Sequence, residues 1–576
     1  MRNYYSKLII SFFLGILLCW TLNSYAYTVP VGIPDPTIYF DGFDPINTSA
    51  PVVNEDGTCS KCPNWPSSEN RGCYFIDNTD PNATDTNNSY GYPDKPRKTI
   101  PEIAYSAGDF IYINGGTYSS KGDRFNWGGV GTASSPIWFC GNPSNRPKLP
   151  RYVHFYINTN YFIMDSIEFP SNGRIDIRPT SENITIKHLV IRNCSFEGTK
   201  SSSDGGAITV GQSTGSPYSG SFISDIVIYN NHMRNYGDVN TTEQCGVYMG
   251  FPMERLWVLK NEIHHFGADG VAGCHNADRD QRYSMYYFIG DNKIYDNGEN
   301  AIDLKAIQHY VISQNEMAGP HYREGGASIV LHYGANSLGC THGWVIFNKI
   351  HNSGAGVAIT DVDAETYVIG NLIYNLFDPS SIDTIDGSGV GFRGMDGKLV
   401  IAGNTIYGYT RHGIVCDQEV LNPEDTVIIE NNILANRSGS GHEIQIDANV
   451  DRVTIRNNLY YYPQGTASIN WNGPIKTLSE MKSLGQCEGG LEGDPKFVNP
   501  SSGDFSLEPN SPAIDNGVES SAYGSFQAEY SLSIKKDFLG ITRPQGEGWD
   551  IGAFEFVEGG GSNGSSPPTP TNLRIQ

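Results

Sequence analysis

Asp303, Lys305, His332 and Arg393 are the side chains whose types and spacing best suit a chemical reaction. A lysine, a histidine and an arginine on one strip supply the positive charge that holds a sugar carboxylate and a base that removes the neighbouring proton. The reaction would be a β-elimination, in which the carboxylate is neutralised, the C5 proton is abstracted and the glycosidic oxygen leaves C4. A structural interpretation stays open, because a lysine on an exposed strand is usually just solvated.

The four side chains would divide the work. Lys305 is the candidate base, provided that nearby cations favour its neutral form, whereas Asp303 beside it favours the charged form. Arg393 would clamp a carboxylate, although a separation of three stacked coils puts it about 14 Å from Lys305. A nearby loop supplies three candidates for substrate binding, unless it is simply a polar loop: His321, Tyr322 and Arg323.

An acidic cluster stands at the start of the same strands. Its members come from two consecutive repeats: Asp269, Glu299, Asn300 and Asp303. Oxygen ligands of this kind can hold Ca²⁺, and the ion would bridge an acidic protein and an acidic glycan. The competing interpretation is structural, because Asp and Asn are common at tight corners, whose geometry they tolerate.

A repeated phrase predicts the elements that position these residues. It consists of aliphatic residues, an Asn, any residue and another aliphatic residue, as in VLKNEI at 258–263 and VIGNLI at 368–373. A period of 23 to 33 residues built from β-branched runs predicts stacked coils whose strands pair in parallel. Each Asn would hydrogen-bond its equivalent in the next coil and form a ladder. The ladder positions are Asn231, Asn261, Asn292, Asn315, Asn348, Asn371, Asn404, Asn432 and Asn458.

Alignment of the coils on this Asn predicts which strand residues face inward. Side chains alternate along a strand, so Asp303 falls in a first outward column. Lys305, His332, Thr360 and Arg393 fall in a second outward column, and a slip of one residue would turn all of them inward. The expected inward slot holds Val271, Ile302, Ile329, Val357, Val390, Ile414 and Ile444.

Other conspicuous residues have packing roles as their favoured interpretation. Three positions after the ladder Asn, His264 and His351 share a column with tyrosines, which favours stacked rings over catalysis. Cys59, Cys62 and Cys73 precede the repeats and favour one or two disulfides over a zinc site, because no second CxxC pair follows. The cysteines scattered through the strands are expected to be buried free thiols.

The chain is expected to divide into five segments. Arg2 and Lys7, an apolar run and small residues up to Ala26 predict a secretory signal peptide, and therefore a secreted, extracellular protein. The full division is a signal peptide (1–26), an N-terminal cap region (27–95), a parallel β-helix (96–465), a C-terminal capping segment (466–556) and a Gly/Ser/Pro-rich linker tail (557–576).

The charge of the chain narrows the choice of partners. The formal net charge is −23, and loss of Arg2 and Lys7 with the signal peptide would make it −25. Such a surface repels nucleic acid and anionic membranes. It would also repel an acidic polysaccharide, unless a cation or a local basic cluster intervenes. We expect a monomer that neither binds nucleic acid nor inserts into a membrane.

The repeats between about 96 and 465 resemble the right-handed parallel β-helix superfamily, which includes pectate lyases, alginate lyases, chondroitinases and polygalacturonases. The segment 502–555, with GDFSLEPNSPAIDNG and DFLGITRPQGEGWDIGAFEF, is similar to the closing segment of many secreted bacterial β-helix proteins. We therefore expect an all-β fold, a right-handed parallel β-helix of about ten or more coils, with an N-terminal cap pinned by a disulfide.

The acidic cluster resembles the calcium site of the family-nine pectate lyases, in which one acidic position in a coil and an acidic trio in the next bind calcium. Asp269 would match the single position, and Glu299, Asn300 and Asp303 would match the trio. Glu299 and Asn300 depart from the family's aspartates. No lysine stands at the family's distance beyond the cluster, where the chain reads NSLGCTHGW, and this leaves the base of that family without a counterpart.

These observations favour a secreted, carbohydrate-active polysaccharide lyase that acts on an acidic glycan, and two other functions remain open. A glycoside hydrolase needs two carboxylates across the scissile bond, for which Asp361 with Asp363, or Asp383 with Asp386, are candidates. The polygalacturonase motifs are not present in order, and TRHG at 410–413 is the nearest fragment. The third function is that of a non-catalytic adhesive rod that binds glycan.

Overall fold

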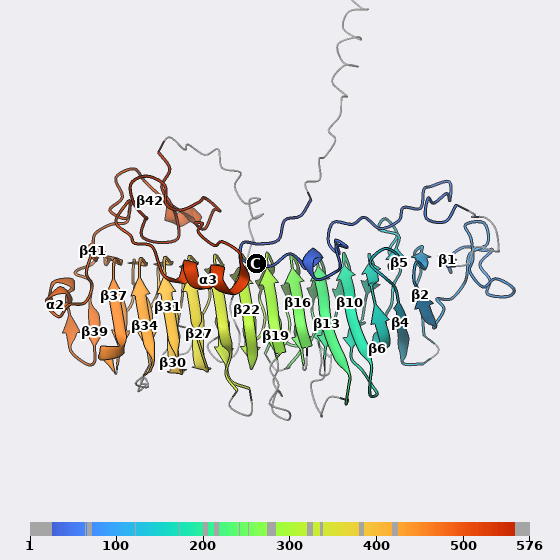
Figure 1. Ribbon diagram of the computed structural model, residues 1–576, viewed down its shortest axis with the longest axis horizontal. Coiled ribbons are helices and arrows are strands. Elements are labelled where there is room, and N and C mark those ends of the chain that lie inside the picture. The colour runs from blue at the N-terminus through green and yellow to red at the C-terminus, as the bar shows by residue number, and fades with distance from the viewer. Residues whose placement is uncertain are drawn as a thin grey trace, which may run out of the picture.

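The computed structural model describes a long stack of parallel coils (Figure 1). The described residues are 26–63, 65, 72–120, 122–171, 173–199, 206–211, 218–240, 242–250, 253–273, 284–319, 326–334, 338–378, 385–417, 424–447 and 449–558. The expected signal peptide and linker tail lie outside them, apart from their inner ends. The stacked parallel strands confirm the expected right-handed parallel β-helix.

Each coil contributes strands to three faces, which we call faces A, B and C. Face A is a parallel ladder of β1 (Cys73–Ile76), β3 (Phe110–Ile113), β5 (Ile137–Gly141), β7 (Phe162–Asp165), β10 (Thr185–Arg192), β13 (Phe222–Tyr229), β16 (Met253–Leu259), β19 (Ser284–Gly290), β22 (Ile307–Ser313), β25 (Thr341–Ile346), β28 (Thr366–Ile369), β31 (Lys398–Ala402), β34 (Thr426–Glu430) and β37 (Val453–Arg456). The sequence placed the first coil at about residue 96, whereas the ladder of face A begins with β1, at Cys73.

Face B carries the candidate functional residues. Its strands are β2 (Ala104–Ser106), β4 (Arg124–Val130), β6 (Tyr152–Asn160), β9 (Ile175–Ile177), β12 (Gly206–Val210), β15 (Cys245–Met249), β18 (Val271–Gly273), β21 (Ile302–Lys305), β24 (Ala327–His332), β27 (Ala355–Val362), β30 (Val390–Met395), β33 (Ile414–Cys416), β36 (Ile444–Ile446), β39 (Ile469–Trp471) and the antiparallel β40 (Ile475–Lys476). A pairing between β6 and β10 joins faces A and B into one 29-stranded sheet.

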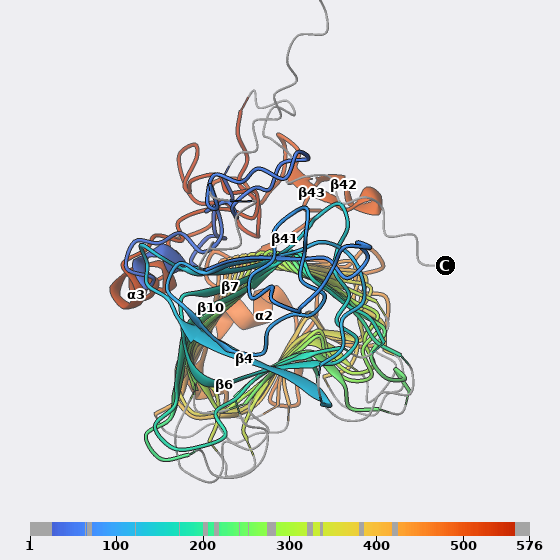
Figure 2. The ribbon, with the colours of Figure 1, turned by 90° about the vertical axis from the view of Figure 1, so that its right-hand side faces the viewer.

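Face C is a separate 12-stranded sheet of short strands. It consists of β8 (Glu168–Phe169), β11 (Ser195–Glu197), β14 (His232–Arg234), β17 (Glu262–His264), β20 (Lys293–Tyr295), β23 (Glu316–Ala318), β26 (Lys349–His351), β29 (Leu372–Tyr374), β32 (Thr405–Tyr407), β35 (Ile433–Ala435), β38 (Leu459–Tyr461) and β41 (Leu491–Glu492). Viewed end on, the coils of the three faces superpose into one tube (Figure 2).

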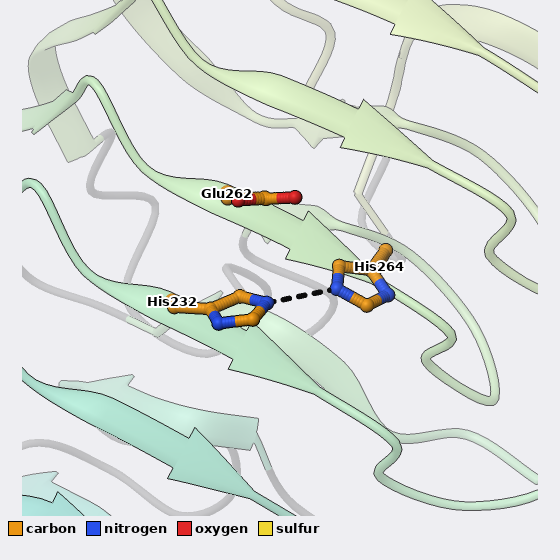
Figure 3. A group of neighbouring side chains, drawn as sticks. All are labelled: His232, Glu262 and His264. Atoms are coloured by element: carbon orange, nitrogen blue, oxygen red, sulfur yellow. Dashed lines mark hydrogen bonds between the residues drawn. The ribbon is translucent and has the colours of Figure 1, made fainter. Parts of the chain in front are cut away.

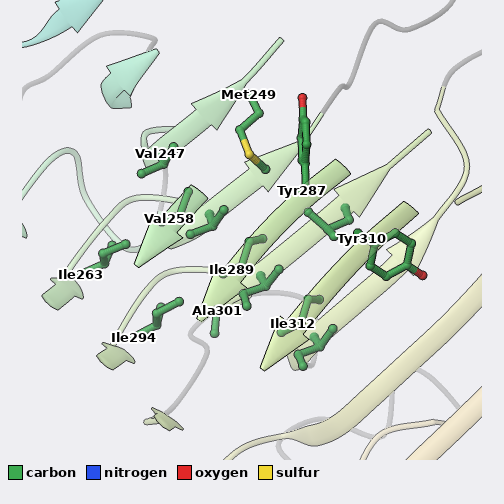
Figure 4. Packing of buried hydrophobic residues seen from close by; sticks show 14 of the residues in the cluster. Val247, Met249, Val258, Ile263, Tyr287, Ile289, Ile294, Ala301, Tyr310 and Ile312 are labelled. Carbon is green, nitrogen blue, oxygen red and sulfur yellow. The ribbon is translucent and has the colours of Figure 1, made fainter. Parts of the chain in front are cut away.

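The interior of the tube is filled by columns of aliphatic and aromatic side chains. Val258, Ile289 and Ile312 form a column on face A, and Ile263 and Ile294 form a column on face C (Figure 4). All five are fully buried. This arrangement explains why every coil repeats aliphatic residues at fixed distances from the Asn, because each side chain packs on its equivalent in the next coil.

The predicted Asn ladder is confirmed along its whole length at the corner between faces A and C. In each step the Nδ2 of one Asn donates to the Oδ1 of the next, at 2.9 to 3.0 Å. The backbone N–H of each Asn donates to the same oxygen of the next coil. These bonds satisfy polar groups that are buried in the corner.

Chain segments from both ends cover the outside of face A. The N-terminal segment (residues 26–50), which includes the 3₁₀ helix η1 (Pro36–Ile38), packs Ile33 and Phe40 in one cluster with Trp257. The helix α3 (Ala522–Tyr530) lies over the same face farther along (Figure 1), where Phe526 packs edge-on against Trp344. Large apolar residues that point outward from face A are therefore buried.

Buried polar contacts attach the N-terminal segment to the coils. The guanidinium of Arg192, which is 3% exposed, donates to Asp165 Oδ2 at 2.7 Å. The same group donates to the carbonyl oxygens of Pro45, Ile46 and Thr48 at 2.8 to 3.1 Å. Asp165 compensates the buried charge of this arginine, and the arginine in turn provides hydrogen-bond donors for the carbonyl groups of the segment.

A disulfide and a short helix stand at the two ends of the tube. A disulfide joins Cys62 to Cys73, so the predicted pinning of the N-terminal cap is confirmed, and Cys59 is a buried free thiol. At the other end, helix α2 (Leu478–Ser483) buries Leu478 and Met481 in the main core cluster. The remaining described elements are η3 (Val450–Arg452), η4 (Pro500–Ser502) and the antiparallel hairpin of β42 (Phe497–Asn499) and β43 (Asp504–Leu507).

Candidate functional site

The register of face B agrees with the alignment made from the sequence. The inward residues pair in a continuous series, and all of them are fully buried: Val271, Ile302, Ile329, Val357, Val390, Ile414 and Ile444. Lys305 of β21 pairs with His332 of β24, so the two side chains come from neighbouring coils as predicted. Asp303 lies two residues before Lys305 on the same outward side of the strand.

Asp303 is the centre of the candidate site because it joins the two basic residues. His332 Nε2 lies 2.8 Å from Asp303 Oδ1, and Lys305 Nζ donates to Asp303 Oδ2. Asp303 itself is only 4% exposed, whereas the side chain of His332 is 24% exposed. The arrangement places a buried carboxylate behind a more accessible imidazole and ammonium group.

The charges of this trio stabilise one another. Burial opposes ionisation of Asp303, but the hydrogen bond from His332 and the charge of Lys305 outweigh it and hold the pKa of this carboxyl well below its usual value. Asp303 is therefore a carboxylate at neutral pH. If the Nε2 of His332 carries the proton that this carboxylate accepts, Nδ1 is the basic nitrogen of the ring.

The acidic cluster at the corner between faces C and B is only partly open to a cation. Asp269 is 1% exposed, and its Oδ1 accepts hydrogen bonds from the backbone N and the Nδ2 of Asn300 at 3.0 and 3.1 Å. Burial, and then the charges of Asp303 and Glu299, raise the pKa of Asp269 well above its usual value. This shift favours the neutral form of Asp269 when no cation is bound.

Asp269 and Asn300 also belong to a second corner ladder that the sequence comparison missed. Each stands two residues before an inward aliphatic residue of face B, and Ser388, His412 and His442 occupy the equivalent positions. The His412 backbone N donates to Ser388 Oγ at 3.3 Å, and the His442 backbone N donates to His412 Nδ1 at 3.1 Å. The bond from Asn300 to Asp269 therefore has a structural role, and the TRHG fragment contributes its histidine to this corner.

The other candidates lie apart from this centre. Arg393 follows His332 in the same column after Thr360, and its guanidinium contacts Asp417 Oδ2 at 3.4 Å. This register keeps Arg393 about 14 Å from Lys305, the separation of three coils. The three loop candidates lie outside the described residues: His321, Tyr322 and Arg323.

The carboxylates considered for a hydrolase give that function no specific support. Asp363 Oδ2 accepts a hydrogen bond from the backbone N of Gly339 at 2.5 Å, and Asp361 lies at the end of β27 with a positive φ of 58°. Asp383 lies outside the described residues, and Asp386 is 4% exposed.

The histidines of face C are packed as the sequence predicted. His264 stacks on Tyr295 with ring centroids 4.6 Å apart, and His351 stacks on Tyr374 at 5.2 Å. The pairings place these rings in one column that also contains Ala318. Sequence comparison did not single out His232, which contacts His264 from the preceding coil.

Comparisons with known proteins concern the fold. Three solved structures are similar: pectate lyase Pel9A (14% identity, 84% of this chain and 96% of that chain, TM-score 0.38), the A-module of the mannuronan C-5 epimerase AlgE6 of Azotobacter vinelandii (15%, 67% and 91%, TM-score 0.38) and PfbA, a surface adhesin of Streptococcus pneumoniae (13%, 67% and 92%, TM-score 0.43). Likenesses at this level say nothing about activity. The sequence has no significant match among the curated proteins.

No helix among the described residues is long and apolar enough to cross a membrane. Residues 280–478 match the family model described as the right handed beta helix region. This match covers coils whose parallel pairing and Asn ladder are continuous in the structure. The described coils therefore have the fold of a right-handed parallel β-helix.

Proposed function

We propose that this protein is a secreted, carbohydrate-active enzyme that cleaves an acidic polysaccharide by β-elimination. The observation that carries the proposal is Asp303, a buried carboxylate that links His332 and Lys305 on two adjacent coils. An acidic glycan needs a local positive centre to approach a protein with a net charge of −23. Lys305 supplies this positive charge on an outward face, next to His332 on the adjacent coil.

The geometry favours His332 over Lys305 as the base. Asp303 would hold the imidazole with Nε2 protonated, so that Nδ1 accepts the C5 proton of a uronic acid. Lys305 would pair with the sugar carboxylate and stabilise the charge that develops on it during proton removal. The electrons of the C5–H bond form the C4–C5 double bond, the C4–O bond breaks, and the leaving oxygen takes a proton from the imidazolium or from water.

Calcium remains part of the proposal as a substrate-bridging ion. Asp269, Glu299 and Asn300 would hold it, since the charges around Asp269 favour a bound cation in place of a proton. Asp303 fits this role less well, because His332 and Lys305 already contact both of its oxygens. Bound calcium would neutralise a glycan carboxylate, and the proton transfer assigned to His332 does not depend on it.

The nature of the cleavage products tests this function. The purified protein is incubated with polygalacturonate, alginate and chondroitin sulfate, with calcium or with EDTA, and ultraviolet absorbance is recorded. We expect unsaturated sugar ends from one of the glycans, because elimination leaves a C4–C5 double bond. Reducing ends without ultraviolet absorbance would instead establish a hydrolase, and glycan binding without cleavage would establish a non-catalytic rod.

A further inference from the structure

Face C carries a cluster of two histidines and a glutamate that the proposed function does not use. His232 lies on β14, and Glu262 and His264 lie on the adjacent strand β17, where His232 pairs directly with Glu262. One nitrogen or oxygen atom from each of the three lies within 4.8 Å of the others. The two imidazoles point toward each other, with their Nε2 atoms 2.9 Å apart, and Glu262 lies beside them (Figure 3).

Neighbouring side chains fix the orientation of these groups. The ring of His264 stacks on Tyr295 at 4.6 Å with an interplanar angle of 8°. Tyr295 also donates its hydroxyl proton to Glu262 Oε1 at 2.7 Å, and His264 Nδ1 lies 2.7 Å from His265 Nδ1. In metal sites, outer partners of this kind hold the far nitrogen of a histidine and the far oxygen of a carboxylate in place.

The contact between the two rings suits a cation. At 2.9 Å one Nε2 donates and the other accepts, so one nitrogen already directs a lone pair into the cluster. Two facing nitrogens share one proton in the absence of an ion. A metal ion can replace this shared proton between the two Nε2 atoms. No proton is released overall if the Nε2 proton of His232 moves to its Nδ1 and His264 remains protonated at Nδ1.

Two cations flank the cluster. Lys293 of β20 pairs with Glu262 in the register, and Arg234 of β14 pairs with His264. The guanidinium of Arg234 donates to Glu197, whose carboxylate offsets this positive charge. Glu262 then contributes the negative charge of the cluster itself.

We propose that His232, Glu262 and His264 form a binding site for one Zn²⁺ ion, with water at the fourth position. Two imidazole nitrogens and a carboxylate oxygen are a ligand set that Zn²⁺ accepts. Nitrogens bound to a tetrahedral zinc stand about 3.3 Å apart, so the observed 2.9 Å needs only a small rotation of the rings. The ion would tie two adjacent coils together on face C, whereas the proposed catalytic residues lie on face B. Zinc binding can therefore be tested independently of lyase activity.

Calorimetric titration with Zn²⁺ of the full chain, freed of metal with EDTA, tests the site. We expect one ion per chain at this site, and a shift of the thermal unfolding midpoint to higher temperature. His232→Asn and Glu262→Gln should each weaken this binding by about tenfold or more, and should remove the visible absorption of bound Co²⁺ used as a second probe. Glu262→Gln keeps the size of the side chain and guards against a folding artefact.

His351→Asn is the matched control, because His351 occupies the same column, stacks on a tyrosine and lies 3.3 Å from Glu316. It should leave Zn²⁺ affinity and stoichiometry unchanged. Absence of Zn²⁺ binding by the unaltered protein would overturn the proposal. Binding of equal strength in His232→Asn and Glu262→Gln would place the ion elsewhere and would overturn it as well.

Discussion

Replacing Asp303 by asparagine will lower the rate of glycan cleavage by about 10³-fold, with little change in size at the site. Asparagine is neutral, so it cannot favour a proton on His332 Nε2 as the carboxylate does. It also cannot form an ion pair with Lys305. The basic nitrogen would then no longer be fixed toward the substrate, and the ammonium group would lose its anchor. The rate at which unsaturated ends form measures this effect, and the denaturation midpoint shows that the variant is folded.

Asp176→Asn is the matched control for this experiment. Asp176 lies on β9 in the same outward column as Asp303, four coils earlier, and is 7% exposed. It contacts Arg174 and Arg178, so it too is a carboxylate between basic residues. The account predicts wild-type activity for this variant. Equal losses in both variants would mean that Asp303 acts through the stability of face B rather than through chemistry.

The largest effect on stability is expected for Asn348→Ala in the middle of the Asn ladder. Asn348 Nδ2 donates to the carbonyl of Ile312 at 2.8 Å and to Asn371 Oδ1 at 3.0 Å. Its Oδ1 accepts two hydrogen bonds from Asn315, at 3.0 Å each. Alanine leaves a buried carbonyl and a buried N–H without partners, so the free energy of unfolding should fall by about 4 kcal/mol.

Chemical denaturation of Asn348→Ala next to Asn82→Ala measures this loss. Asn82 is exposed in the connection that follows β1, so its replacement should change the free energy of unfolding by less than about 0.5 kcal/mol. A midpoint for Asn348→Ala equal to that of Asn82→Ala would show that the ladder is not what stabilises the corner.

The fold could be predicted from the sequence because one repeated residue, the ladder Asn, marks the same corner in every coil. The Asn at each corner has to be Asn, since both its amide and its carbonyl bond to the neighbouring coils. Counting from that residue with a period of two gave the correct inward slot, and with it the pairing of Lys305 and His332. Local pattern and tertiary structure agree wherever a coil repeats its neighbour.

Features that depend on contacts between distant segments could not be predicted in this way. Nothing in the sequence of the N-terminal segment indicates that Pro34 will accept a hydrogen bond from Trp257 on face A. The sequence indicated a metal-binding role for Asp269 but not its hydrogen bond to Asn300, because that bond depends on how the two coils stack. His232 was missed because the comparison followed the column of His264, whereas His232 lies in the adjacent column of the preceding coil.

The central claim is that His332, held by Asp303, removes a proton from an acidic glycan. The most direct test follows unsaturated ends over time for the wild-type protein and for His332→Ala, on the glycan that the wild-type protein cleaves, with glycan binding measured in parallel. We expect His332→Ala to bind the glycan normally and to form unsaturated ends 10² to 10⁴ times more slowly, the range of about two to four orders of magnitude that general base catalysis supplies. Formation of unsaturated ends by His332→Ala at the wild-type rate would contradict the account.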